Sequence, residues 1–358
     1  MTDRIYLDHA ATSPLRPEAK RAMEEGFALW ANPSSPHAEG RKAKQALEDA
    51  RDRIKRSLGW DGEVIFTSGA SEALWIALNR SKAKRRIVSA VEHDAVFRAA
   101  PDAEVVPIDP SGEFAGNLDV SKLEELLADP EPAVVAIQHI NSEVGLDLFH
   151  WLRPNYVRRI RDAGHMLLAD CSQSAGKKKL PDAHMIVISA HKFGGPIGIG
   201  ALLVEDFALL EPGGGHERGY RQGTENLPAV LGMAAALELG GIEGWLMTDV
   251  ERQRAFEWFE MASHVERVIC PERWPEWIFA IAHESKSANA MLIGLDREGI
   301  AVSAGSACSS GTLKKSRVLN AFGVPDDVAA RTIRVSLGWS STYGDIENFI
   351  DAWYLASG

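Results

Sequence analysis

Short apolar runs rich in β-branched residues recur through the first two thirds of the chain, and polar residues follow each run. The clearest runs span 64–67, 86–89, 105–108, 134–137, 166–169, 185–188 and 199–204. Segments with helical spacing of apolar residues lie between them, as in 37–58. Apolar strands that alternate with helices are typical of a mainly parallel α/β sheet covered on both faces. Such sheets bind ligands at the carboxyl ends of their strands, where this chain places its polar residues.

Composition limits the classes of function. The chain has 358 residues, of which 45% are hydrophobic and 25% charged, which suits a globular protein of roughly two domains. A net charge of −11 argues against a nucleic-acid-binding surface, so we expect no direct nucleic-acid partner. Three scattered cysteines make neither a disulfide framework nor a zinc site, and we assign no metal ligand. The N-terminus lacks a signal-peptide core and no apolar run approaches about 18 residues, so we expect a cytoplasmic protein without a membrane partner.

The pattern changes after Glu205. A glycine-rich segment at 213–219 and a polar loop at 221–226 precede a helical segment at 227–239, and Gly240-Gly241 is a natural break. Strands and helices alternate again from Trp245 to the end. We therefore predict a large domain over 13–240 and a smaller α/β domain formed by 241–358 together with 1–12.

Lys192 follows the buried run 185–188 within Ser189-Ala190-His191-Lys192. An ammonium group near a buried strand costs free energy unless it is paired or neutralised. One chemical use is condensation of the amine with an aldehyde cofactor, and pyridoxal phosphate (PLP) is the common aldehyde in enzymes. Taken alone, Lys192 could equally be an exposed lysine just beyond a strand.

Other polar residues beyond strand ends suit the same cofactor. Asp170 can pair with a protonated pyridine nitrogen and keep the ring electron-accepting. Gln173 can donate to a ring oxygen, and His93 can lie on a ring face. Each residue alone also fits a solvated or locally satisfied loop position.

The junction between strand 64–67 and the following helix could bind a phosphate. Free N–H groups and the positive dipole end at the start of a helix attract anions, and Ser71 can add a hydroxyl donor. Ser189 and His191, on either side of the lysine segment, could reach the same phosphate. The alternative is a simple helix cap in which Ser71 and Glu72 serve only the helix.

Motifs along nearly the whole chain occur in the order found in one known family. They are Tyr6-Leu7-Asp8-His9-Ala10-Ala11-Thr12, Asn32-Pro33-Ser34-Ser35-Pro36-His37, Thr67-Ser68-Gly69-Ala70-Ser71-Glu72, Glu92-His93, Asp170-Cys171-Ser172-Gln173-Ser174, Ser189-Ala190-His191-Lys192, Gly213-Gly214-Gly215-His216-Glu217-Arg218-Gly219, Arg221-Gln222-Gly223-Thr224 and Gly305-Ser306-Ala307-Cys308. The chain resembles the class V aminotransferase-like PLP enzymes, and within them the cysteine desulfurases of the NifS/IscS type. The resemblance implies PLP-dependent transferase fold type I, with a mainly parallel central sheet and a smaller α/β C-terminal domain.

The resemblance also implies a role for each matching residue. Lys192 would hold PLP covalently and later move protons at the substrate carbon, with His93 stacked on the ring. Asp170 would pair with the pyridine nitrogen and Gln173 with the ring oxygen. The residues that would hold the phosphate are Ala70, Ser71, Ser189 and His191, with Thr224 supplied by the partner subunit of a homodimer.

The substrate carboxylate would be bound by Arg334, with Asn32 nearby. Ser142 stands where the family usually has an asparagine that contacts cofactor and substrate. A hydroxyl is shorter than an amide, so we expect this contact to be weaker or to pass through water.

Cys308 is the residue that indicates which reaction the chain would catalyse. It lies among small residues in 303–311 and is followed by Lys314-Lys315, and exposure with nearby positive charge favours a thiolate. The resemblance implies conversion of L-cysteine to L-alanine, with a persulfide on Cys308 that passes to a protein acceptor for iron–sulfur cluster assembly or tRNA thiolation. On its own, Cys308 could be a lone buried cysteine in a turn. We expect Cys171 to be a packing residue, and we assign no role to Cys270.

Two alternatives stay open. The first is a related class V PLP enzyme with another substrate, such as a selenocysteine lyase, which would still form alanine after Cys308→Ala. The second is a non-catalytic homologue that acts as a scaffold, which would carry no lysine-bound chromophore. The presence of Lys192, Asp170, His93 and Cys308 together disfavours the second.

Overall fold

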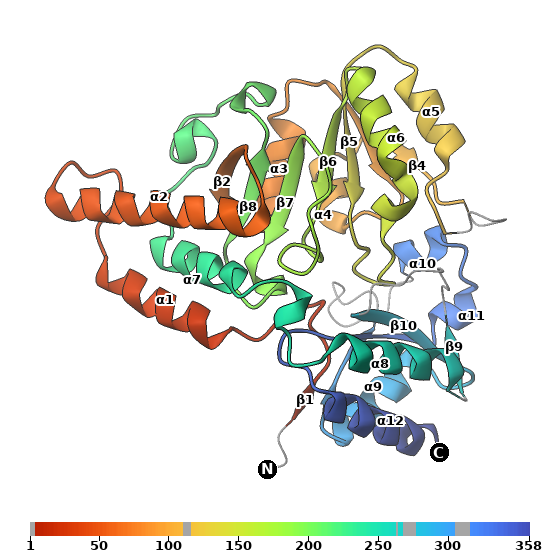
Figure 1. Ribbon diagram of the computed structural model, residues 1–358. Coiled ribbons are helices and arrows are strands. Elements are labelled where there is room, and N and C mark those ends of the chain that lie inside the picture. Colours follow the sequence, from red (N-terminus) through yellow and green to blue (C-terminus); the bar gives the residue numbers. More distant parts are fainter. Residues whose placement is uncertain (1–3, 110–115, 263, 268–276, 305–315) are drawn as a thin grey trace.

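A seven-stranded sheet forms the centre of the computed structural model, which describes residues 4–109, 116–262, 264–267, 277–304 and 316–358 (Figure 1). Its strands are β2 (Glu63–Thr67), β3 (Arg85–Ser89), β4 (Glu104–Val106), β5 (Ala133–Gln138), β6 (Met166–Asp170), β7 (Met185–Ser189) and β8 (Gly200–Val204). Their order across the sheet is β2-β8-β7-β6-β5-β3-β4. β8 pairs antiparallel with both neighbours, and the strands from β7 to β4 pair in parallel. The predicted mainly parallel sheet is confirmed.

Helices cover both faces of this sheet. One face carries α3 (Ala70–Asn79) and α4 (Asp94–Ala99), and the other carries α1 (Pro17–Ala28), α2 (Ala38–Leu58), α5 (Val120–Leu127), α6 (Leu148–Asp162) and α7 (Leu227–Glu238). Successive side chains of a strand point to opposite faces. In β7, Ile186 and Ile188 join the core beneath α1, α2 and α7, whereas Met185 and Val187 join the core beneath α3. Burial on both faces explains why the strand sequences are almost continuously apolar.

α7 is buried nearly all round and packs against both α1 and α2. An apolar surface on all sides is typical of a helix enclosed by its neighbours. The contact with α1 is close at Gly26, where a Cβ would lie 2.6 Å from Pro228 Cα and 3.1 Å from Leu231 Cδ1. Glycine at this position therefore sets the distance between the two helices.

A second, smaller sheet lies in the C-terminal part of the chain. Its antiparallel strands, in the order β12-β13-β10-β9, are β12 (Ser303–Ala304), β13 (Thr332–Ser336), β10 (Ile278–His283) and β9 (Val265–Arg267). The helices of this part are α8 (Asp249–Met261), α9 (Ala288–Arg297), α10 (Arg317–Ala321), α11 (Asp326–Ala329) and α12 (Tyr343–Ser357). A separate aromatic core, with Phe259, Phe279 and Phe349 among its members, holds the sheet against α8, α9 and α12.

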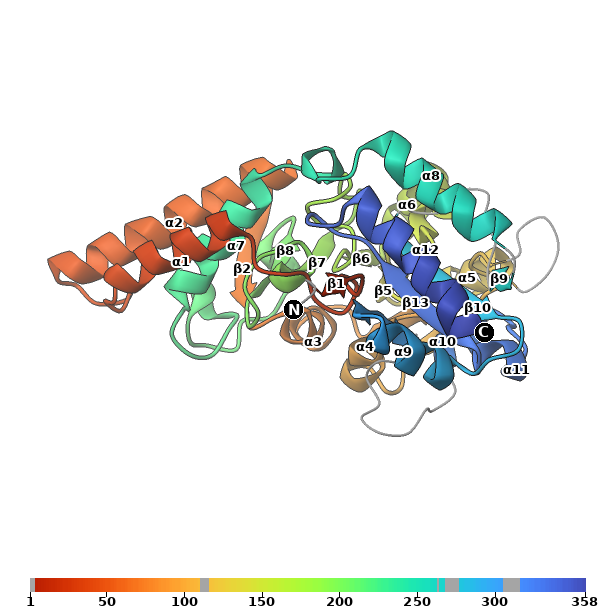
Figure 2. The same cartoon turned by 90° about the horizontal axis from the view of Figure 1, so that it is seen from below.

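The N-terminal segment joins this smaller core (Figure 2). β1 (Ile5–Tyr6) pairs in parallel with β11 (Ile300–Ala301), and Leu7 is buried in the aromatic core. The chain then crosses to the large sheet, where Ser13 N donates to His191 O at 2.7 Å. We propose that the domain boundaries lie at the predicted positions, near residues 12 and 241.

Short 3-10 helices lie in the connections of the described part of the chain: η2 (Ala190–Lys192), η3 (Phe207–Leu209), η4 (Glu217–Gly219) and η5 (Ile242–Gly244). η4 lies in the glycine-rich segment, where Glu217 adopts a left-handed φ of 48°. The buried Glu217 carboxylate accepts hydrogen bonds from Arg51 Nη1 at 2.8 Å and from Phe66 N at 2.9 Å. The glycine-rich segment is thereby fixed to α2 and β2.

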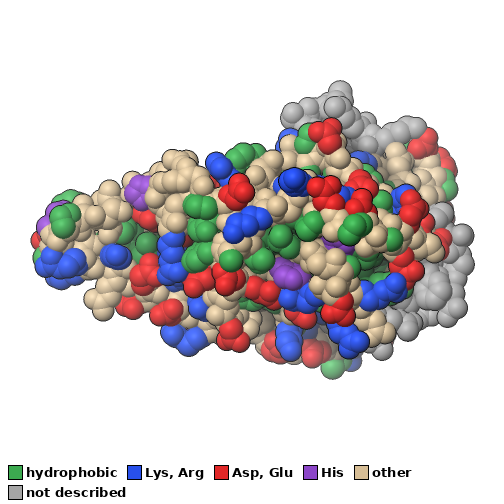
Figure 3. All heavy atoms as spheres, turned by 90° about the horizontal axis from the view of Figure 1, so that it is seen from above, with side chains coloured by type: hydrophobic (Ala, Val, Ile, Leu, Met, Phe, Trp, Pro, Cys, Tyr) green, Lys and Arg blue, Asp and Glu red, His purple; other side chains and the backbone are tan. Residues whose placement is uncertain are grey.

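Charges of both signs are intermingled on the face that Figure 3 shows, among the side chains that the structure describes. That face therefore presents no field of a single sign. Within the described ranges, no helix is both long and apolar enough to cross a lipid bilayer.

Substitution of Gly26 by alanine tests the contact between α1 and α7. Because the new Cβ would overlap the Pro228 backbone, Gly26→Ala is expected to lower the free energy of unfolding by about 1–3 kcal/mol. Gly344 lies in α12, where a Cβ would meet only Thr342 Oγ1 at an ordinary 3.8 Å, so Gly344→Ala is the matched control and should be neutral or stabilising by up to about 1 kcal/mol. Urea denaturation measures both changes. Equal effects of the two substitutions would contradict the close packing of α1 and α7.

Candidate active site

A cavity of about 1140 Å³ lies at the carboxyl ends of the parallel strands. Ten of the residues predicted from the sequence line it: Ala70, Ser71, His93, Ser142, Asp170, Gln173, Ser189, His191, Lys192 and Arg334. They come from β13 and from the ends of β2, β3, β5, β6 and β7 or the segments directly after them. The topology brings them together because parallel strands end at one edge of the sheet.

Lys192 ends η2, directly after β7. Its Nζ donates to Ala10 O at 2.6 Å and to Ala11 O at 2.7 Å. Both carbonyls belong to the N-terminal segment that packs with the smaller core. The half-buried amine is thus held at the junction of the two parts of the chain.

Asp170 and Gln173 lie at the end of β6 and in the turn after it. Asp170 Oδ1 accepts from Ser172 N at 2.9 Å and from Ser172 Oγ at 2.5 Å, which fixes the carboxylate at the cavity. Gln173 Nε2 donates to Ala10 O at 2.9 Å. Gln173 Oε1 is buried and has no hydrogen-bond partner within the described part of the chain. The Gln173 amide therefore has hydrogen-bonding capacity left for a bound group.

His93 caps the N-terminus of α4. Its Nδ1 accepts from Ala95 N at 3.1 Å, so the proton of the neutral ring is on Nε2. Burial lowers the His93 pKa, the charge of Lys192 lowers it further, and the charge of Asp170 opposes both. The ring is therefore uncharged at neutral pH, which suits contact with a flat apolar ligand.

The N-terminus of α3 forms one wall of the cavity. Gly69 caps it at φ 152°, and no atom lies within 4 Å of the position that a Gly69 Cβ would occupy. The neighbouring Gly200 is tightly packed, since its Cβ would lie 2.6 Å from Ile188 O. Ser71 makes no cap hydrogen bond, and Glu72 instead accepts from Ser68 N. The cap alternative for Ser71 is therefore wrong, whereas Glu72 does serve the helix.

His191 faces the same wall. Its Nδ1 lies 3.1 Å from Thr12 Oγ1. Burial lowers the pKa of His191 to about 4, and the charges of Lys192 and Lys177 add to this effect. The ring would accordingly act as a neutral hydrogen-bonding group at neutral pH.

Arg334 is almost completely buried in β13. Its Nη2 donates to Asp8 Oδ1 and its Nη1 to Ser142 O, both at 2.9 Å, and its Nε has no partner among the described residues. The sequence interpretation placed Arg334 here but gave no role to Asp8. Asp8 belongs to the N-terminal motif, and its position just before Ala10 and Ala11 is the signal that could have identified it.

Among the other carboxyl groups in the lining, Glu143 and Glu92 have raised pKa values, and the sequence interpretation gave neither a role. Burial raises the pKa of Glu143 to about 7, and Glu143 Oε2 accepts from Ser316 Oγ at 2.6 Å. Burial raises the pKa of Glu92 to about 8, and Glu92 Oε1 accepts from Gln138 N at 2.8 Å. Glu92 was identifiable only as the residue before His93, because burial cannot be seen in the sequence.

Two predicted residues do not line the cavity of their own chain, and a third lies outside the described residues. Asn32 is exposed in the connection between α1 and α2, where its Oδ1 accepts from Ser34 N at 2.8 Å, and it does not line the cavity of its own chain. The helix pair extends away from the smaller sheet and carries this connection with it (Figure 1). Thr224 is exposed and also absent from the lining. Cys308 lies outside the described residues, as does Cys270, whereas Cys171 is fully buried, in agreement with a packing role.

The pH dependence of stability tests the burial of Glu92. The folded protein keeps a proton on Glu92 up to pH about 8, whereas a glutamate in an unfolded chain loses it near pH about 4.3. The contribution of Glu92 to stability is therefore complete below the lower value and is lost as the pH rises to the upper one.

Glu92→Gln cannot titrate, so its free energy of unfolding minus that of the wild type should increase between pH 5 and pH 8. The expected slope is up to about 1 kcal/mol per pH unit, measured by urea denaturation. Exposed Glu24→Gln is the control and should give a flat difference. A flat difference for Glu92→Gln as well would show that Glu92 is ionised in the folded protein.

Comparison with known proteins gives one consistent result. Residues 5–349 match the family model described as Aminotransferase class-V. The chain is 33% identical to a cysteine desulfurase IscS of Dictyoglomus turgidum, over 98% of this chain and 94% of that protein. A cysteine desulfurase of Cereibacter sphaeroides has the same identity and coverage.

Solved structures agree with this match. An X-ray structure of a NifS-like protein from Rickettsia africae superposes with a TM-score of 0.85 at 28% identity, over 99% of both chains. A structure described as SspA in complex with cysteine has a TM-score of 0.78 at 26% identity, over 94% of this chain. By sequence and by fold, the chain belongs to the class V aminotransferase family.

Proposed function

We propose that the protein is a PLP-dependent cysteine desulfurase that converts L-cysteine to L-alanine and transfers the sulfur to Cys308. One observation carries the proposal: Lys192, Asp170, Gln173 and His93 face one cavity that also contains the start of α3. The names of the relatives support the choice of cysteine as substrate.

The residues present fit PLP. The Gln173 amide nitrogen carries two hydrogens, of which Ala10 O accepts one, so the second could be donated to the ring oxygen of PLP. The open space at Gly69 leaves the N–H groups at the start of α3 accessible to a phosphate. Asp170 offers a fixed carboxylate to the pyridine nitrogen. When bound, PLP would supply an electrophilic aldehyde and an electron-accepting ring.

Three side chains around the bound PLP would then each have a separate role. Lys192 would carry the proton between the substrate Cα and the product. His93, neutral because it is buried, would hold the ring plane without adding charge. Arg334 would bind the substrate carboxylate through its remaining Nε donor and through exchange with its present partner Asp8.

The sulfur step is assigned to Cys308. Its thiolate would form an S–S bond with the substrate sulfur as the substrate Cβ–S bond breaks, and the electron pair left on Cβ would take up a proton. The products would be a persulfide on Cys308 and alanine. We further propose a homodimer in which Thr224 of one subunit reaches the phosphate of the other, and a protein acceptor that removes the sulfur for iron–sulfur cluster assembly or tRNA thiolation. The cytoplasmic location stays a prediction.

The attachment of PLP is tested by Lys192→Ala. Without the amine, the visible absorbance of lysine-bound PLP should disappear and alanine formation from cysteine should fall at least about 10³-fold. Lys179→Ala removes an exposed lysine and should retain both signals. A Lys192→Ala protein that keeps the absorbance and the activity would refute the assignment.

The role of the thiol is tested by Cys308→Ala. Alanine formation from L-cysteine and protein-bound persulfide should both fall more than about 100-fold, while the PLP absorbance is unchanged. Cys270→Ala, to which we assign no role, is the matched control. If the Cys308→Ala protein still forms alanine from both selenocysteine and cysteine, the result would favour the lyase alternative.

Substrate binding is tested by Arg334→Lys. A lysine cannot reproduce the planar donor geometry, so KM for L-cysteine should increase about 10–100-fold, the loss expected for one or more charge-assisted hydrogen bonds, with a smaller change in kcat. Arg297→Lys, at the end of α9 and outside the cavity, should leave both constants unchanged. An unaltered KM in Arg334→Lys would indicate that Arg334 serves only to hold Asp8.

A further inference from the structure

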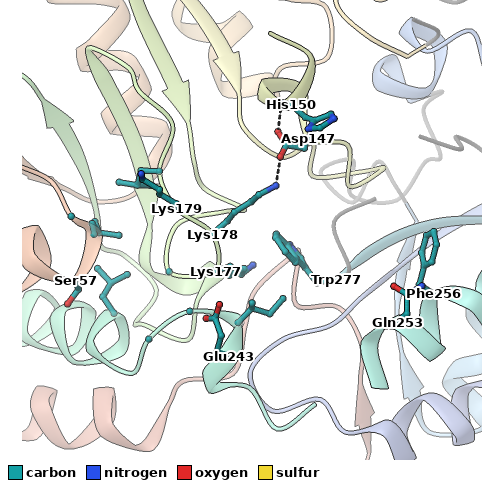
Figure 4. A pocket seen from close by; sticks show the side chains of 18 residues that line it. Ser57, Asp147, His150, Lys177, Lys178, Lys179, Glu243, Gln253, Phe256 and Trp277 are labelled. Atoms are coloured by element: carbon teal, nitrogen blue, oxygen red, sulfur yellow. Dashed lines mark hydrogen bonds and ion pairs between the residues drawn. The ribbon is translucent and has the colours of Figure 1, made fainter. Parts of the chain in front are cut away.

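A second cavity, of about 860 Å³, is lined by the same β6–β7 connection that carries Gln173 (Figure 4). Its other walls come from the end of α2, the segment after α7, and α8. Three consecutive lysines, Lys177, Lys178 and Lys179, are part of the lining. The proposed desulfurase reaction uses none of them.

Lys177 is the buried member of the three. Only 5% of the residue is exposed, and within the described part of the chain its Nζ has no hydrogen-bond or ion-pair partner. Nζ lies over the Trp277 ring in a cation–π arrangement, 5.9 Å from the ring centroid. Burial lowers the Lys177 pKa to about 7, and the charge of Lys192 adds to the shift. A buried ammonium without a counter-charge is costly, which indicates that a compensating group belongs beside it.

Trp277 supplies a second buried donor in the same cavity. It is 5% exposed, and its Nε1 has no hydrogen-bond partner among the described residues. Figure 4 shows the Lys177 side chain extending towards this ring. Buried polar groups are nearly always hydrogen-bonded, so the unsatisfied Trp277 N–H near the Lys177 ammonium favours an acceptor bound in this cavity.

The acceptors in the wall do not serve this purpose. Asp147 accepts from Lys178 Nζ and from His150 N, as the dashed lines in Figure 4 show. Glu243 lines the cavity, but the described structure contains no ion pair between it and Lys177. Three lysines against two carboxylates leave excess positive charge in the lining.

We propose that this cavity binds an organic phosphate monoester. Its dianionic head would accept hydrogen bonds from Lys177 Nζ and Trp277 Nε1, with the exposed Lys179 adding charge at the rim. Its apolar body would lie against Leu180, Leu237 and Phe256, which line the same cavity. The volume is in the range of small-molecule sites.

Calorimetric titration of the PLP-saturated protein with phenyl phosphate tests the proposal, because bound PLP already fills the phosphate site at α3. Saturable binding is expected in the wild type. Lys177→Met should weaken it at least about tenfold, because a charged hydrogen-bond donor is lost. Trp277→Phe keeps an aromatic ring but removes the N–H together with part of the indole, so it should weaken binding about three- to tenfold.

Lys84→Met removes an exposed lysine elsewhere and is the control, with unchanged affinity expected. Benzoate carries a single charge and should bind at least about tenfold more weakly than phenyl phosphate. Circular dichroism identifies a Lys177→Met protein that fails to fold, in which case Trp277→Phe decides the outcome. Absence of saturable binding in the wild type, unchanged affinity in a folded variant, or equal affinity for benzoate would each overturn the proposal.

Discussion

The site depends on one constraint, the placement of the Lys192 amine at the end of a buried strand. β7 is buried along its whole length, so its direction and register are fixed by the strands on either side. The three residues of η2 follow β7 directly, and the Lys192 Nζ at its end donates to the carbonyl groups of Ala10 and Ala11. Everything that the cavity can do follows from an amine that the large sheet positions and the N-terminal segment holds.

The N-terminal segment connects the two parts of the molecule. Ala10 N donates to Ser336 Oγ in the smaller sheet, while Ala10 O accepts from both Lys192 and Gln173 in the larger part. His9 lies so close to Gly338 that a Cβ on this glycine would be 2.0 Å from His9 Nδ1. Burial is the larger cause that lowers the His9 pKa to about 3, and the charge of Lys177 is the second, so the ring stays neutral. A change in this short segment would therefore affect both sheets and the lysine.

Much of the fold and about half of the chemistry could be predicted from the sequence. Near-continuous apolar runs identified the strands of the central sheet, because a strand buried on both faces needs apolar side chains at successive positions. Once the strands were identified, Lys192, Asp170 and His93 could be recognised as polar residues that lie at strand ends, where α/β sheets bind ligands. The antiparallel order of the smaller sheet, and the pairing of β1 with β11, depend on contacts between distant segments that no local pattern contains.

The remaining part of the site depends on burial, which a sequence does not give. Asp8 was given no role from the sequence but pairs with Arg334, which is distant in the chain. Glu92 and Glu143 were given no role from the sequence, whereas burial brings the pKa of each near neutrality. Asn32 belonged to a recognised motif, yet the helices on either side carry it away from the cavity of its own chain.

The central claim is that the Lys192 amine, and no other, bonds to the cofactor. Lys177 is the informative competitor, since it is buried, has a lowered pKa and lies within electrostatic reach of Lys192. Borohydride reduction of the PLP-saturated protein, followed by peptide mass spectrometry, locates the modified lysine. We expect the label on the peptide that contains Lys192; a label on Lys177, or no labelled lysine, would contradict the account.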